Sequence, residues 1–587
     1  MVTNSTRYPL LIDPQGQGQN WIMKKYAESM DKYRSLANLN NPKFKDFFLK
    51  YCLEEGKTIV IEGIENEVDP VLDPVLEKQV IWKKSRGIIK IGGTDMDFNK
   101  NFLMFMTCRL PNPSFSPELS AKTTIIDFTV TQKGLEQQLL GKVISKEQKA
   151  LEDSLNALLT DVNNNKKELQ KLDKNLLQRL TESKGNLLDD TELMEVLNST
   201  KTQAKEVAVK LADAETKTKE INDKREQYRP VAIRGAALYF TMIEVSLVNW
   251  MYNSSLEQFL VLFNESIDNS DKAQSPSKRV DLIIKFLTKH VYKYVNRGLF
   301  ERDKITFVLM MCFKILITAG KINSNDVGLF LKAGAAEDIK ARPKPTGNQF
   351  SFISEKAWLN IIAFSKHCFN DAPVATFKEL PELVVKNQPG WQAFFERNDP
   401  ENAPIPDLTE RLSQEKEENR AFMQLCLLRS VREDRTLVAS SAFINAVLGT
   451  EFTEPISYPI ESIWAESKYY VPILFLLSAG ADPTSSIDEF ARKKKKFPTE
   501  KVSMGEGQEE VARKVIKICT ESGGWVILQN CQLGLKFMEE TEQTIISFIN
   551  GDGQKPHDEF RLWITCEPHI RFPLGLLQKV IKVTNEP

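Results

Sequence analysis

The sequence has 587 residues, of which 42% are hydrophobic and 27% charged, and its formal net charge is −1. A chain of this length can hold several domains with sizeable cores, and its balanced charge excludes an overall field that would attract nucleic acid or an acidic membrane. Eight cysteines without a CxxC pair and four histidines without ligand spacing argue against a metal site or a disulfide framework. We therefore expect a soluble intracellular protein that binds neither nucleic acid nor membrane.

The first 130 residues alternate apolar strands with helices. Residues 8–12 form a short strand, a polar turn follows, and a helix is expected to begin near Trp21. Further buried strands are expected at residues 58–61 and 102–106. Strands that alternate with helices are typical of a parallel α/β sheet.

Residues 135–228 have the pattern of a long antiparallel helical hairpin. Apolar residues recur at alternating steps of four and three, which is the spacing of a coiled-coil seam. The predicted seam consists of Leu151, Leu155, Leu158, Val162, Asn165, Leu169, Leu172 and Leu176 in the outgoing arm, and Leu193, Leu197, Ala204, Val207 and Leu211 in the return arm. A polar break at residues 183–186 connects the arms, and Asn165 is expected to fix their register at some cost in stability. A hairpin folded flat onto a globular body is the alternative.

Apolar helices are expected from residue 230 to about 341, followed by a proline-rich linker at 341–347 and a second helical stretch. A second α/β unit begins near Val471, with strands expected at 471–477, 524–528 and 560–565.

The strand-to-helix loop at Gly480 lies where a phosphate-binding P-loop would lie, but its chemistry is absent. A P-loop counted from Gly480 requires Gly-Lys-Ser/Thr where this sequence has Ser485, Ser486 and Ile487, so no lysine can reach the phosphates. The strand at 524–528 ends in Gln529 and Asn530 instead of the two acids that would hold magnesium and activate water.

The first unit shows the same loss. Its strand at 58–61 is followed by Glu62 and Gly63, which keeps one carboxylate and places glycine where a general base would stand. Thr107 and Thr565, each on an apolar strand, complete the positions assigned to these two degenerate nucleotide sites. We expect no catalytic residue in either site and no metal site.

Several segments together resemble the C-terminal motor region of a dynein heavy chain, most closely an axonemal outer-arm type. The segments are YPLLIDPQGQ (8–17), IEGIENEVDP (61–70), PELS (117–120), KGLEQQLL (133–140), YRP (228–230), GLFE (298–301), GWVILQNC (524–531), FRLWIT (560–565) and TNEP (584–587). Their joint order spans nearly the whole chain.

The resemblance implies α/β AAA+ modules with helical subdomains and a coiled-coil hairpin. Residues 1–130 would be the large domain of the fifth module without its N-terminal part, 131–229 the buttress hairpin and 230–345 the helical small domain. Residues 346–587 would be the large domain of the sixth module, cut before its lid. ATP and magnesium would bind in modules that this segment lacks, and the segment itself would not hydrolyse ATP.

The implied partners are the remaining AAA+ modules and the stalk of the same heavy chain, and also intermediate chains, light chains and microtubules. The implied location is the cytoplasm and cytoskeleton, in the axoneme of a cilium or flagellum. Two alternatives stay open: a free-standing ATPase with a coiled-coil arm, and a non-motor scaffold with AAA+-like modules.

Overall fold

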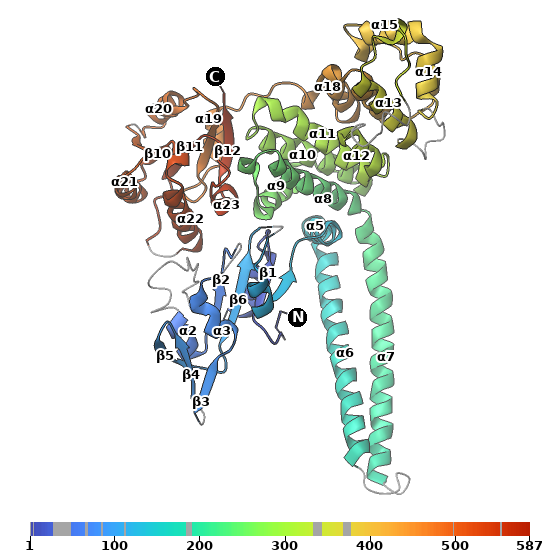
Figure 1. Ribbon diagram of the computed structural model, residues 1–587. Coiled ribbons are helices and arrows are strands. Elements are labelled where there is room, and N and C mark those ends of the chain that lie inside the picture. The colour runs from blue at the N-terminus through green and yellow to red at the C-terminus, as the bar shows by residue number, and fades with distance from the viewer. Residues whose placement is uncertain are drawn as a thin grey trace. The chain divides into compact units, whose positions relative to one another are not determined.

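The computed structural model describes residues 2–3, 5–27, 49–64, 68–83, 86–110, 113–182, 191–332, 343–367, 377–496, 498–551 and 554–586, in some helices without their side chains. The chain divides into two compact units, Met1–Gly134 and Leu135–Pro587 (Figure 1). Each unit is described by itself.

The first unit is built on a parallel sheet with the strand order β2-β6-β1-β7. Its elements are β1 (Pro9–Ile12), α1 (Gln17–Lys25), α2 (Lys50–Glu55), β2 (Thr58–Ile61), α3 (Asp73–Leu76), β3 (Val80–Lys83), β4 (Arg86–Ile91), β5 (Thr94–Phe98), β6 (Leu103–Cys108), α4 (Pro117–Lys122) and β7 (Thr124–Asp127). Most apolar side chains of β1, β2 and β6 are buried, on both faces of the sheet, as expected for a covered parallel sheet.

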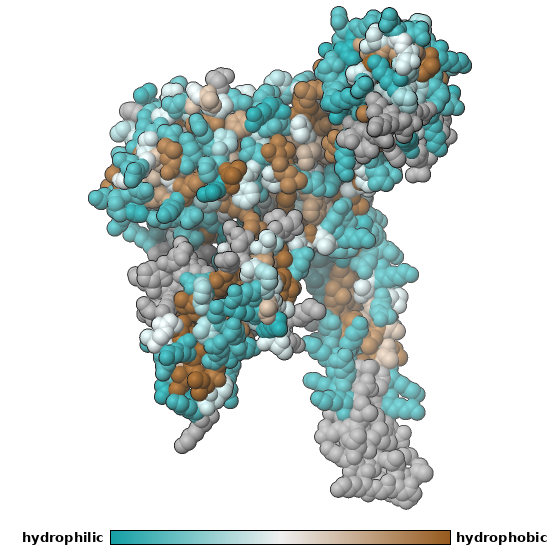
Figure 2. All heavy atoms as spheres, in the orientation of Figure 1, coloured by the Kyte–Doolittle hydropathy of each residue, from teal (hydrophilic) through white to brown (hydrophobic). Residues whose placement is uncertain are grey.

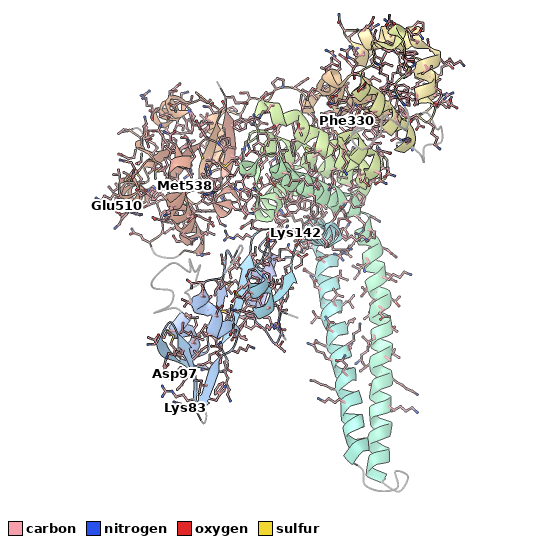
Figure 3. All side chains as sticks on the ribbon, in the orientation of Figure 1. Lys83, Asp97, Lys142, Phe330, Glu510 and Met538 are labelled. Carbon is pink, nitrogen blue, oxygen red and sulfur yellow. The ribbon has the colours of Figure 1, made fainter. Side chains whose placement is uncertain are left out.

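A second, antiparallel sheet of the order β3-β4-β5 is inserted between β2 and β6. Arg86 of β4 and Asp97 of β5 form an exposed bidentate ion pair across it, with Nη2 2.6 Å from Oδ2. Figure 3 labels Asp97 and also Lys83 at the end of β3. The sequence pattern did not predict this insertion.

The second unit begins with helix α5 (Gln132–Glu147), which the boundary between the units crosses near its start, followed by α6 (Lys149–Glu182) and α7 (Thr191–Glu226). Figure 1 shows α6 and α7 lying side by side, and Arg225 of α7 pairs with Glu152 of α6 at 3.2 Å. The outgoing arm is not continuous from Leu135 as predicted, because the helix breaks at Gln148. The connection at 183–190 lies outside the described residues.

A cluster of helices follows the hairpin. Its members are α8 (Arg229–Glu244), α9 (Leu256–Asn269), α10 (Pro276–Asn296), α11 (Glu301–Thr318), α12 (Ser324–Lys332), α13 (Glu355–His367), α14 (Leu380–Lys386), α15 (Gln388–Glu396), α16 (Thr409–Ser413), α17 (Glu417–Val431) and α18 (Thr436–Val447). Among the described residues one stretch, Arg229–Leu247, is long and apolar enough to cross a membrane. It contains α8, whose Leu238 and Met242 are buried in this cluster.

One aromatic group joins the earlier and later helices of the cluster. The ring of Phe313 on α11 lies 5.5 Å from Phe330 on α12, 5.6 Å from Phe422 on α17 and 5.7 Å from Phe443 on α18, measured between centroids. Figure 3 labels Phe330 within this group. A core is therefore shared across the linker predicted at 341–347, of which residues 341 and 342 lie outside the described part of the chain.

The second parallel sheet has five strands in the order β12-β8-β11-β10-β9. Its elements are α19 (Ile460–Glu466), β8 (Ile473–Leu477), α20 (Thr484–Lys493), β9 (Glu500–Ser503), α21 (Glu509–Ser522), β10 (Trp525–Gln529), α22 (Leu535–Asn550), β11 (Arg561–Cys566), α23 (Leu574–Leu577) and β12 (Ile581–Asn585). β12 lies at one edge, and there the backbone N–H of Thr584 donates to the carbonyl of Arg297 at 2.8 Å. The loop after α10 therefore covers this edge.

The two parallel sheets and the predominantly helical remainder confirm the α/β prediction with helical regions. The division into four domains stays a prediction, as does the assignment of α6 and α7 as a coiled coil.

Candidate nucleotide sites

The two parallel sheets share one topology, which identifies corresponding positions. Leaving out β9, the second sheet has the order β10-β11-β8-β12, in which each strand has the chain position of its counterpart in β2-β6-β1-β7. The registers β6–β1 and β11–β8 then align Thr107 with Thr565. By the same counting, Glu62 corresponds to Gln529 and Gly63 to Asn530. Ligands of parallel α/β sheets bind at the carboxyl ends of such strands.

In the second sheet the loop after β8 has the outline of a phosphate loop without its donors. Gly480 is exposed and has a φ of 84°, a left-handed conformation that glycine adopts without strain. Ser485 and Ser486 lie on the exposed surface of α20. Ile487, at the position of the magnesium-binding hydroxyl, is fully buried in the core, so no polar group is available there.

The end of β10 is joined directly to the start of α20. The side-chain amide of Gln529 donates to the hydroxyl of Thr484 at 2.8 Å. Asn530 is left-handed, with a φ of 54°, and its amide donates to Ser503 at 3.2 Å. Its backbone N–H lies 3.4 Å from the hydroxyl of the buried Thr565. These hydrogen bonds connect groups that would otherwise face a metal ion and its water.

Cys531 and Cys566 follow these strand ends and are both buried. Burial raises the pKa of the Cys566 thiol to about 12, so this residue is an unreactive thiol near neutral pH. Among the described residues no group of three or more His, Cys, Asp or Glu side chains could hold a metal ion.

In the first sheet the loop after β1 contains a carboxylate that binds the start of the following helix. The carboxylate of Asp13 accepts the backbone N–H groups of Gln17 at 2.9 Å and of Gln19 at 2.8 Å, at the start of α1. Burial raises the pKa of this carboxyl, while the hydrogen bonds from the backbone lower it. Helix N-terminal amides that would attract a phosphate are thus occupied by an internal carboxylate. Because Asp13 caps the helix, α1 begins at Gln17 and not near Trp21 as predicted.

Glu62 is also engaged. Its carboxylate accepts a hydrogen bond from the side chain of Gln19 and pairs with Arg109 at 3.1 Å. Gly63 has a φ of 73°, which matches the left-handed Asn530. Thr107 is buried, and within the described part of the chain its hydroxyl has no hydrogen-bond partner. Because Gln19 and Arg109 both hold this carboxylate, Glu62 is poorly placed to activate water.

In each sheet the structure brings the predicted positions to one edge, at the carboxyl ends of the strands. Sequence reasoning missed Asp13, Gln19, Arg109 and Thr484, which hold these positions together. A signal for the site in the first sheet was available in the sequence, because a strand, Gly16 and a helix follow one another as a strand, Gly480 and a helix do in the second sheet. Gly16 and Gly480 occupy the same left-handed position of the shared topology. Among the described residues at these strand ends, the arrangement provides neutral side-chain amides but no lysine and no free acid–base pair.

The predicted seam positions fall on α6 and α7. In the described part, Leu155 and Val207 are buried, and Leu151, Leu158, Val162, Asn165 and Leu211 are half-buried. The side chains of Leu169, Leu172, Leu176, Leu193, Leu197 and Ala204 lie outside the described part. In the coloured part of the two helices, Figure 2 shows hydrophilic residues with hydrophobic patches between them.

Two family models match the chain. Residues 1–207 match the ATP-binding dynein motor region, and residues 468–584 match the dynein heavy chain region D6 P-loop domain. The chain is 45% identical to the dynein gamma chain of the flagellar outer arm of Chlamydomonas reinhardtii, 43% to human dynein axonemal heavy chain 8 and 41% to mouse dynein axonemal heavy chain 5. These alignments cover 100% of this chain and 12% of each relative.

Proposed function

The chain belongs to the axonemal dynein heavy chain family, and we propose that it forms a non-hydrolysing part of the motor's AAA+ ring. In this proposal the two sheets are the fifth and sixth modules of an outer-arm type heavy chain. The hairpin α6–α7 is a coiled-coil buttress that transmits conformational change to the microtubule-binding stalk.

The proposal also covers location and partners. The motor would act in the axoneme of a cilium or flagellum, as an ATP-driven, minus-end-directed microtubule motor. The remaining AAA+ modules and the stalk would contact this segment within the heavy chain. Intermediate chains, light chains and microtubules would be partners of the whole complex.

One observation carries the mechanical part. Helix α7 ends at Glu226 and α8 begins at Arg229, so only Gln227 and Tyr228 separate the arm from the buried helix of the cluster. Tyr228 is itself buried. A connection this short leaves little freedom, so a rotation of the cluster would move the arm with it.

The degenerate nucleotide sites support the proposal that this segment does not hydrolyse ATP. Hydrolysis of ATP requires cations around the transferred phosphate and a group that orients the attacking water. The second site offers Gln529, Asn530 and a buried Ile487 instead. We expect the purified chain to show no ATP turnover above background in a phosphate-release assay. Turnover that is abolished by Glu62→Gln would contradict the proposal and favour the free-standing ATPase.

Transmission is tested in the whole heavy chain. Leu155→Asn places an amide in the buried contact between the arms, and Asp153→Asn changes an exposed residue on the same helix as a matched control. We expect the seam variant to keep basal ATP turnover. Its stimulation by microtubules should fall about tenfold, because the lost burial of an apolar side chain costs about 1–2 kcal/mol and uncouples the arm. Equal stimulation in both variants would contradict the role of the hairpin.

A further inference from the structure

We propose that Arg279 anchors the root of the hairpin by holding Glu147 at the break between α5 and α6. The anchor sets the direction in which α6 leaves the helical cluster. The importance of this anchor for force transmission rests on the proposed function.

The break separates a docked helix from an arm. Leu139, Leu140 and Val143 of α5 are buried, and a Cβ on Gly235 of α8 would lie only 2.9 Å from Leu139 Cδ1, so α5 and α8 pack closely. After Gln148, α6 shows its first fully buried side chain at Leu155. Glu147 is therefore the last residue of the docked helix.

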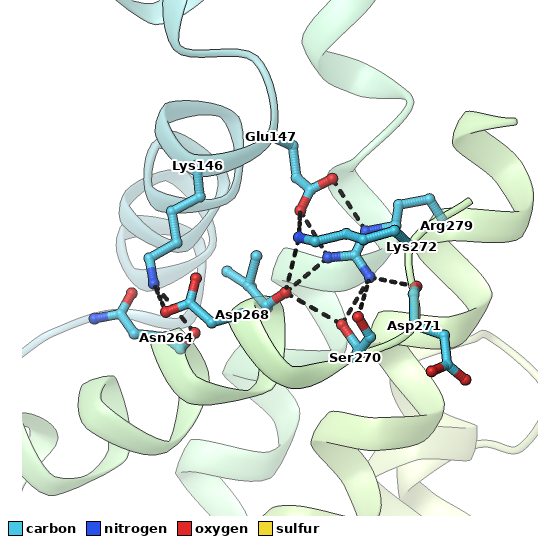
Figure 4. Close-up of polar contacts among 9 residues, drawn as sticks. Lys146, Glu147, Asn264, Asp268, Ser270, Asp271, Lys272 and Arg279 are labelled. Carbon is cyan, nitrogen blue, oxygen red and sulfur yellow. Dashed lines mark hydrogen bonds and ion pairs between the residues drawn. The ribbon is translucent and has the colours of Figure 1, made fainter. Parts of the chain in front are cut away.

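Arg279, on the first turns of α10, is 2% exposed and binds the last residue of α5, directly before this break. Its Nε and Nη2 donate to the two carboxylate oxygens of Glu147 at 3.0 and 2.7 Å (Figure 4). Such a bidentate pair fixes orientation as well as distance. Since Glu147 is also largely buried, with 11% of its side chain exposed, the pair is shielded from solvent and salt.

The remaining donors of Arg279 bind the end of α9. Nη2 donates to the carbonyl of Ile267 at 2.7 Å, and Nη1 donates to the carbonyls of Ser270 at 3.1 Å and Asp271 at 2.7 Å. Nη1 also donates to the Ser270 hydroxyl at 2.8 Å. Carbonyls at a helix C-terminus lack partners within the helix and attract a cation. One guanidinium thus joins α5, α9 and α10.

Two lysines surround the anchor from exposed positions. Lys272 approaches Glu147 at 3.3 Å with 67% of its side chain exposed, and Lys146 pairs with Asp268 on α9. Figure 4 shows both lysines beside the buried pair. Exposed ion pairs of this kind contribute little to stability. A substitution in such a pair therefore serves as the control for substitutions in the buried pair of Arg279.

The experiment measures the angle of the arm in the whole chain. Spin labels are placed at Lys166→Cys on α6 and Lys285→Cys on α10, both exposed positions. Cys52 and Cys368 are replaced by serine, because the other six cysteines are buried. Double electron–electron resonance then gives the distribution of distances between the labels in Arg279→Lys, Glu147→Gln and the control Lys272→Gln.

We expect one narrow distribution for the parent chain and for Lys272→Gln, and a distribution at least twice as wide or clearly shifted for the other two variants. Lysine keeps the charge but cannot bind Glu147 in bidentate fashion and the carbonyls of α9 at once. Should Arg279→Lys fail to fold, Glu147→Gln alone carries the test. An unchanged distribution in a folded Glu147→Gln, or equal broadening in Lys272→Gln, would overturn the proposal.

The outcomes separate the anchor from the proposed function. Broadened distances without any loss of microtubule stimulation by the same variants in the whole heavy chain would leave the anchor standing and contradict force transmission. Unchanged distances, together with lost stimulation in Leu155→Asn, would overturn the anchor and leave force transmission standing.

Discussion

Lys582 lies on β12 with its side chain enclosed by protein, although lysine is seldom fully buried. Its ammonium donates to the backbone carbonyls of Asn253 and Leu577, the latter at 2.8 Å. Burial, together with the smaller effect of the nearby charge of Arg297, lowers the pKa of this lysine to about 7. The carbonyls partly compensate for the loss of water, but no carboxylate in the described part of the chain accepts a hydrogen bond from this ammonium.

This pKa makes stability depend on pH. Above about pH 7 the folded chain holds a neutral amine, whereas the unfolded chain keeps the proton up to about pH 10.4. The unfolded state then binds more protons, so the free energy of unfolding rises with pH in this window, by at most about 1.4 kcal/mol per pH unit. We expect Lys582→Met to remove this slope in urea titrations between pH 6.5 and 9.5. Lys579→Met, three residues earlier, should retain it, and an unchanged slope in Lys582→Met would contradict the assignment.

At the scale of elements, the hairpin shows what a local pattern can and cannot predict. The alternating steps of four and three predicted where α6 and α7 lie, because helical periodicity is a property of consecutive residues. The break at Gln148 was missed, because it depends on contacts of Glu147 with Arg279, 132 residues away. For the same reason the start of α1 was predicted too late, near Trp21, since the contacts of Asp13 with the first turn become visible only once β1 and α1 are folded.

Asn165 is a half-buried amide on α6, at a predicted seam position. We expect Asn165→Leu to stabilise the arm by about 1 kcal/mol, because an apolar side chain replaces a polar one in a half-buried position. We also expect it to loosen the register, which a polar seam residue specifies.

Disulfide trapping measures the register. Counting along the two antiparallel helices from the pair Glu152–Arg225 places Leu158 opposite residue 219, next to the half-buried Thr218. Cysteines at Leu158 and Thr218 should therefore link in the parent chain. Cysteines at Leu158 and Leu211, one heptad away, should link only in Asn165→Leu. If that variant forms only the Leu158–Thr218 link, the role of Asn165 is refuted.

At the scale of the whole molecule, the helices of 229–332 and of 409–447 share the aromatic group around Phe313, which is 6% exposed. Phe313→Ala should destabilise both groups of helices together, by about 3–5 kcal/mol, because it leaves a cavity among Phe330, Phe422 and Phe443. Hydrogen exchange followed by mass spectrometry would show this as faster exchange in both α11 and α18. Faster exchange confined to α11 would mean that the two groups fold independently.

The parallel sheets were predictable because their strands are short apolar runs with turns between them. Which positions meet at their carboxyl ends was predictable in part. Glu62 and Asn530 directly follow strands and Gln529 is the last residue of β10, and in each sheet the structure brings the predicted positions to one edge. The side chains that bind these positions were not predictable from the sequence, since Arg109 and Thr484 contact Glu62 and Gln529 from other parts of the chain. Long-range order of this kind has no local signature.

The contact of Thr584 with the loop after α10 has a consequence for solubility. An edge strand with free N–H and C=O groups recruits strands from other molecules. In the whole chain the carbonyls of Arg297 and Leu299 take the N–H and the hydroxyl of Thr584, which blunts that edge. A fragment beginning at about residue 468 would keep every strand of the second sheet but leave β12 uncovered, and it would tend to associate edge to edge. We therefore expect the helices before it to keep the sheet soluble by covering this edge.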